Sequence, residues 1–104
     1  MTTNGEITPK RVCSGKTRPE DWSAYNKRTD AIFVQVDISG CNFQSTPNIV
    51  VSLHGIDDHW LTLGTSSVYH AKATGFRVYL KMGSLTPQDA VDKKYSIHYV
   101  AVGD

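Results

Sequence analysis

The feature that most constrains the fold of this chain is a hydrophobic pattern with a period of two residues. Every second residue is apolar from Ile32 to Ile38, and the same alternation recurs in the ranges 75–82 and 95–102. Successive side chains of a β-strand point to opposite faces, so this pattern is typical of strands with one buried face. No window carries a sustained helical period, which predicts an all-β chain.

Turn residues divide the chain into short segments of this kind. We expect a helical turn only around Pro87–Val91, and Pro47 is placed where it can open a strand. Six short strands with little helix indicate an antiparallel sandwich or barrel. The predicted strands are 10–16, 32–38, 48–54, 65–71, 75–82 and 95–102.

Length and charge limit the classes of protein to which the chain can belong. Its 104 residues fit one domain, which we place at residues 10–104 after a flexible tail at residues 1–9. A net charge of +1 gives no electrostatic footprint for nucleic acid or for an anionic membrane. The sequence predicts no membrane span and no signal peptide, which leaves its cellular location unknown.

Two of the predicted strands are apolar on both faces. Val50 faces away from its apolar neighbours, and so do Val100 and Val102 on the last strand. A sheet face that met only water would not need these valines, so we interpret them as part of a subunit interface. The alternative is a set of scattered surface valines, which folded proteins commonly carry.

Few residues point to chemistry. Cys13 and Cys41 either form a disulfide, worth about 3 kcal/mol for a loop of this length, or stay as free thiols. The stretch from His54 to His59 contains metal-ligand residue types, but its spacing favours a polar turn. No nucleophile elbow or phosphate loop is present, so we expect no enzyme activity, no metal and no cofactor.

The two tryptophans allow two interpretations. An exposed indole can stack on the apolar face of a sugar, as in lectins. Large aromatic side chains more often pack inside the protein, however. We therefore expect Trp22 in the core and Trp60 anchoring a loop.

Five segments in order resemble H-type lectins, the snail agglutinin family that also includes the C-terminal domain of discoidin-like lectins. The segments are Arg11–Lys16, Asp21–Trp22, Asn42–Leu53, Ala73–Val78 and Tyr95–Ala101. The resemblance covers about residues 10–102 and implies a six-stranded antiparallel β-sandwich that assembles as a homotrimer. It also implies a secreted or cell-surface protein that binds galactose or N-acetylgalactosamine on glycans or glycoproteins, at clefts between subunits.

The sugar contacts of that family carry over to four positions. Its acidic residue matches Asp30, its arginine falls on Leu63, and its aromatic and polar pair falls on Gly83 and Ser84. A leucine in place of the arginine and a glycine in place of the aromatic weaken this carry-over. Two functions therefore stay open, a carbohydrate-binding trimer and a protein-interaction or oligomerisation module on the same scaffold.

Overall fold

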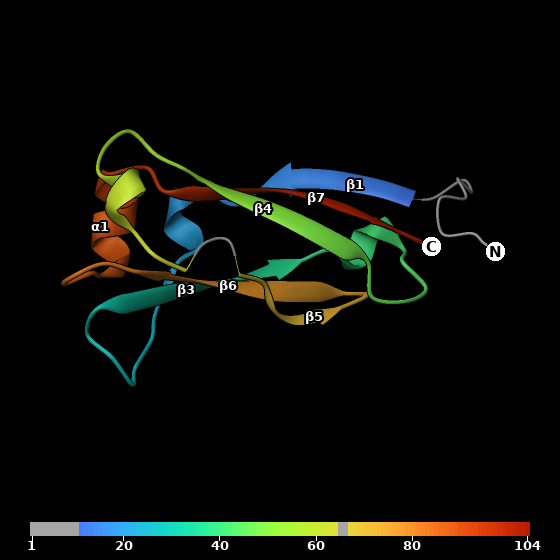
Figure 1. The fold of residues 1–104 in the computed structure, drawn as a ribbon, viewed down its shortest axis with the longest axis horizontal. Coiled ribbons are helices and arrows are strands. Elements are labelled where there is room, and N and C mark those ends of the chain that lie inside the picture. Colours follow the sequence, from blue (N-terminus) through green and yellow to red (C-terminus); the bar gives the residue numbers. More distant parts are fainter. Residues whose placement is uncertain (1–10, 65–66) are drawn as a thin grey trace.

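A computed structural model describes residues 11–64 and 67–104. Its strands form two antiparallel sheets, ordered β1-β7-β4 and β2-β3-β6-β5, and Figure 1 shows them as two layers. The strands are β1 (Arg11–Lys16), β2 (Ser23–Ala24), β3 (Ala31–Asp37), β4 (Asn48–His54), β5 (Tyr69–Lys72), β6 (Gly75–Lys81) and β7 (Ser96–Gly103). Short helical segments are η1 (Pro19–Asp21), η2 (Ser39–Cys41), η3 (His59–Leu61) and α1 (Pro87–Asp92).

The prediction of a mostly β fold with antiparallel sheets is confirmed, but the strand count of six is wrong. The structure has seven strands, because the two-residue strand β2 pairs with β3 and is too short to show any periodicity. The strand predicted over residues 48–54 has the same bounds as β4. Residues 1–10 and 65–66, which include the predicted tail and parts of two predicted strands, lie outside the described residues.

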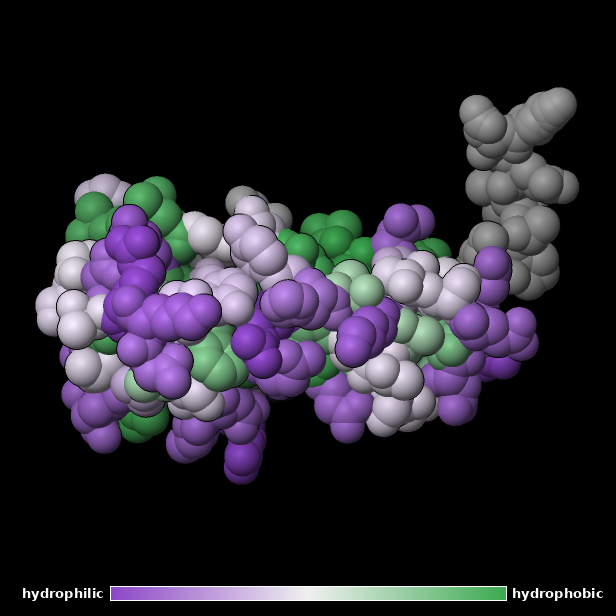
Figure 2. Space-filling model, turned by 90° about the horizontal axis from the view of Figure 1, so that it is seen from below, coloured by the Kyte–Doolittle hydropathy of each residue, from purple (hydrophilic) through white to green (hydrophobic). Residues whose placement is uncertain are grey.

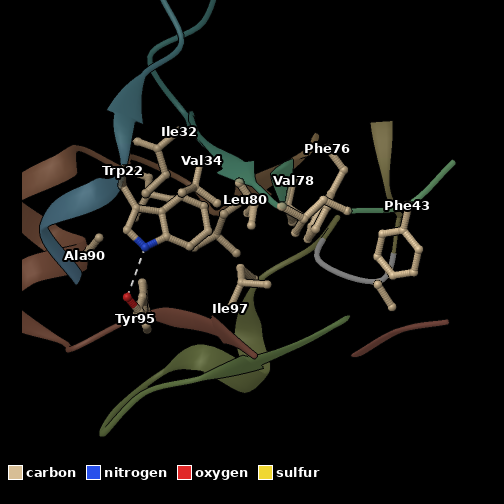
Figure 3. Packing of buried hydrophobic residues seen from close by; sticks show 14 residues of the cluster. Trp22, Ile32, Val34, Phe43, Phe76, Val78, Leu80, Ala90, Tyr95 and Ile97 are labelled. Atoms are coloured by element: carbon tan, nitrogen blue, oxygen red, sulfur yellow. Dashed lines mark hydrogen bonds between the residues drawn. The ribbon is translucent and has the colours of Figure 1, made fainter. Parts of the chain in front are cut away.

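The core lies between the two sheets, which gives a sandwich-like arrangement. The alternating residues of β3 and β6 share one inner face, where Val34 lies opposite Val78 and both are fully buried. Ile97 and Ala101 of β7 meet them from the other sheet. In Figure 3 the indole of Trp22 lies among these residues, and its Nε1 donates a 3.0 Å hydrogen bond to the Tyr95 carbonyl oxygen.

Two local features close the ends of this core. The helix α1 begins with a capping box, in which the Asp89 carboxylate accepts a 2.8 Å hydrogen bond from the Thr86 backbone N–H. The disulfide between Cys13 and Cys41 links β1 to the connection between β3 and β4, with a Cα–Cα distance of 6.0 Å. Within the described part of the chain, no helix is long and apolar enough to cross a membrane.

Candidate functional site

The loop between β2 and β3 is held by an ion pair at its end. Arg28 donates two hydrogen bonds to Asp30, from Nε to Oδ1 at 2.7 Å and from Nη2 to Oδ2 at 2.9 Å. Lys81, the last residue of β6, places its Nζ 3.7 Å from Asp30 Oδ2. The hydrogen bonds from Arg28 lower the pKa of Asp30 to about 2, and the same pair raises the pKa of Arg28. Asp30 is therefore a carboxylate at any physiological pH.

Backbone contacts bring the predicted sugar-site positions to the end of β6. Leu63 and Lys81 exchange two backbone hydrogen bonds of 2.9 Å, and the Met82 N–H donates to the Asp30 carbonyl oxygen at 3.1 Å. Gly83 and Asp30 line one hollow of about 860 Å³, and Ser84 is the next, exposed residue. Asp30, Leu63 and Gly83 therefore lie around Lys81, although they are far apart in the sequence.

Three tyrosines adjoin this charged cluster. The ring of Tyr79 makes edge contacts with Tyr25 and Tyr69, with ring centroids 5.3 and 5.1 Å apart. Tyr69 stays 48% exposed, so its ring is available to a ligand. The three tyrosines, Leu63, Arg28 and Lys81 line a hollow of about 400 Å³. We add Asp30, which pairs with both cations, and call this set the tyrosine–aspartate site. Its residues are Tyr25, Arg28, Asp30, Leu63, Tyr69, Tyr79 and Lys81.

Sequence reasoning missed the residues that supply the cation and the aromatic rings here. Arg28 lies only two residues from Asp30, and that spacing was the available signal. Nothing local marks Tyr69, because only the pairing of β5 with β6 brings it beside Tyr79. Figure 2, viewed from the side of the four-stranded sheet, shows hydrophilic residues along the whole face with apolar areas between them.

The outer face of the three-stranded sheet carries a cluster of valines. Val100 of β7 lies opposite Val50 of β4, and Val102 lies opposite Val12 of β1. Val50 is 72% exposed and Val12 69%. We call these four residues the valine face. Next to it the rings of His54 and His98 stack with centroids 3.4 Å apart, and Ser52 Oγ is 3.1 Å from His54 Nε2.

The segment from His54 to His59 and the two tryptophans lie outside the tyrosine–aspartate site and the valine face. The segment from His54 to His59 disperses its polar groups, because His54 stacks on His98 while Asp58 pairs with Lys93 at 2.7 Å. The prediction that Trp60 anchors a loop is wrong, because its side chain is 78% exposed beside Leu61 on the turn η3. Trp22 lies in the core as predicted.

An ionised carboxylate beside two cations and the exposed ring of Tyr69 suits a polyhydroxylated ligand. The carboxylate accepts hydrogen bonds from hydroxyl groups, the cations donate to ring oxygens, and a tyrosine face packs against C–H groups. No protein-family model matches the chain, and no curated protein matches it in sequence.

Proposed function

We propose that this chain is a carbohydrate-binding domain that recognises galactose-type sugars at the tyrosine–aspartate site. The observation that carries the proposal is that Asp30 and Leu63 both contact Lys81 at the end of β6, beside the tyrosine rings. Asp30 and Leu63 are two of the positions onto which the resemblance to H-type lectins places sugar contacts. The β-sandwich of that family and its secreted or cell-surface location are part of the same proposal.

Within this proposal, the site replaces the family contacts that the sequence lacks. Arg28 and Lys81 supply cationic donors where the family's arginine falls on Leu63. Tyr69 supplies the exposed ring that Gly83 cannot provide. The Asp30 carboxylate accepts hydrogen bonds from sugar hydroxyls in exchange for part of its bonding to Arg28.

The proposal includes assembly through the valine face into a homotrimer. Three of its valines are at least 45% exposed, and they adjoin one another across paired strands, so burying them against a second copy removes apolar surface from water. The number of copies comes from the family resemblance. Several linked sites then bind a multivalent glycan by avidity, which compensates for a weak single site.

Glycan arrays followed by calorimetry test this function. We expect binding to galactose- or N-acetylgalactosamine-terminated glycans. Asp30→Asn should lower affinity about tenfold or more, because a sugar hydroxyl loses a charged acceptor. Asp92→Asn, the same change at the far end of α1, should have no effect. Absence of binding to every glycan by the assembled protein would contradict the proposal.

A second candidate is a protein-interaction module, favoured by the turn around η3. Ile56, Trp60 and Leu61 are 65%, 78% and 49% exposed, and a cluster of exposed aromatic and aliphatic side chains is typical of a protein-binding surface. The array separates the two candidates. If the chain is a protein-interaction module, a Trp60→Ala variant loses its protein partner in a pull-down, and galactose does not elute that partner from the wild-type chain.

A further inference from the structure

Arg77 is held in one position on the outer face of β6. Its guanidinium carbon lies 4.4 Å from the ring centroid of Phe33, a cation–π contact with the neighbouring strand. Its Nε donates to Gln35 Oε1 at 3.0 Å, and its Nη1 donates to the Tyr79 hydroxyl at 3.4 Å. Three neighbours therefore fix a side chain that is ordinarily mobile.

This arginine has no carboxylate partner among residues 11–64 and 67–104. The ion pairs of that part of the chain involve Arg18, Arg28, Lys81 and Lys93. A guanidinium has five N–H donors, and the contacts above use two of them. A fixed arginine with spare donors loses little conformational entropy when it binds an anion.

A hollow of about 660 Å³ is lined by Arg77 and by a second cationic side chain, Lys72. Lys72 and His70 of β5 line it, together with Thr74. Asp37 lines it as well, and its carboxylate, which accepts a 2.8 Å hydrogen bond from the Ser39 N–H, keeps its negative charge. The lining therefore carries more positive than negative groups.

The hollow and the tyrosine–aspartate site lie along the same outer face of β6, where Arg77 donates a hydrogen bond to the Tyr79 hydroxyl. Arg77, Tyr79 and Lys81 alternate along the outer face of β6, and residues four apart on a strand are separated by about 13 Å. The Tyr79 ring lies between the two ends and contacts Tyr25, Tyr69 and Phe33. One monosaccharide is too short to reach both ends, whereas an oligosaccharide can lie along the row.

We propose that Arg77 binds the acidic group, carboxylate or sulfate, of an oligosaccharide whose galactose-type ring occupies the tyrosine–aspartate site. This inference rests on the proposed carbohydrate-binding function and names its ligand class, an acidic glycan. A polyanion such as nucleic acid is disfavoured, because the net charge of the chain is only +1.

Calorimetry with three forms of the same galactosyl oligosaccharide tests the inference. The forms are the neutral oligosaccharide, its sialylated derivative and its sulfated derivative. Free sialic acid and inorganic sulfate show whether the anion alone binds. We expect an acidic form to bind about tenfold more tightly than the neutral core, with the difference shrinking as salt is added. Arg77→Gln should abolish that difference, which is measured as the ratio of the acidic to the neutral affinity because Arg77 also donates a hydrogen bond to Tyr79 of the tyrosine–aspartate site.

Two further variants separate charge from geometry. Arg77→Lys keeps the charge and the aliphatic stem over Phe33 but loses the planar fork, so it should recover only part of the difference. Arg11→Gln removes an equal charge from β1 and should change nothing. Equal binding of all three ligands overturns this inference but not the proposed function. An equal loss of the preference for the acidic ligand in the Arg77→Gln and Arg11→Gln variants does the same. Binding of none of them overturns the proposed function.

Discussion

At the scale of single residues, the ion pair between Arg28 and Asp30 can be tested through the pKa of the Asp30 carboxyl group. Its pKa is about 2 instead of the ordinary 3.8, mainly through the hydrogen bonds from Arg28. We expect Arg28→Gln to raise that pKa toward 3.8, and Lys81→Gln, which removes a weaker contact, to raise it less. A carbon-13 NMR titration of the side-chain carboxyls measures both shifts.

The sign of the pH dependence follows from the direction of this shift. The pKa of Asp30 is lower in the folded than in the unfolded chain, so the pair stabilises the fold above about pH 4. That contribution disappears as the pH falls toward 2, where the folded carboxyl becomes protonated. An Asp30 pKa that is unchanged in the Arg28→Gln variant would show that the pair does not form in solution.

The two tryptophans give an internally controlled test of the core. Trp22 is 4% exposed and donates a hydrogen bond to the Tyr95 carbonyl oxygen, whereas Trp60 is 78% exposed. Trp22→Phe leaves a void and an unpaired carbonyl, so we expect a loss of about 2 to 4 kcal/mol in the free energy of unfolding. Trp60→Phe should change it by less than about 0.5 kcal/mol. Urea unfolding measures the free energy of unfolding of both variants. A loss for Trp22→Phe as small as that for Trp60→Phe would place Trp22 outside the core.

At the scale of elements, β1 is an edge strand whose attachment depends on two contacts. It pairs only with β7 in the three-stranded sheet, and the disulfide joins it to η2. Replacing Cys13 and Cys41 by serine should destabilise the fold by about 3 kcal/mol. Backbone amides of β1 should then exchange faster than those of β3, which has partners on both sides. Equal exchange in the two strands would contradict this order.

Elements with a long alternating pattern were predictable from the sequence, and short ones were not. Pro47 marks the start of β4, and the helical turn expected around Pro87–Val91 corresponds to α1. The strand β2 has two residues, which is less than one repeat of a period-two pattern. In the candidate site, Asp30 was named from the resemblance to H-type lectins, but Tyr69 depends on strand pairing across the sheet, which no local pattern encodes.

At the scale of the whole molecule, the proposed assembly depends on the valine face. A lysine at Val50 or Val100 would bury an unpaired charge in that interface, so we expect either change to give monomers. Ile56→Lys changes an equally exposed apolar residue away from this face and should leave the assembly intact. Sedimentation velocity at micromolar concentration distinguishes these outcomes. A wild-type chain that is monomeric in the same experiment would contradict assembly itself.

We expect the proposed assembly to be sensitive to pH, because two stacked histidines lie next to the valine face. Burial, His54 and Lys16 all lower the pKa of His98 from its ordinary 6.5, and Lys16 of β1 lies opposite His98 in the paired strands. In the proposed assembly, burial against a second copy would add to the cost of charging His98.

The native state therefore binds fewer protons than the unfolded chain just below pH 6.5, and its stability falls as the pH drops through that range. The same reasoning applies to His98 in the proposed assembly, because its ring lies 3.4 Å from that of His54 next to the valine face. We expect association to weaken between about pH 7.5 and pH 5.5, within the range where histidine ordinarily titrates. Replacing both His54 and His98 by glutamine should make the strength of association the same at the two pH values. Sedimentation of the two proteins at each pH measures this, and a pH dependence that persists in the double variant would assign the effect to other groups.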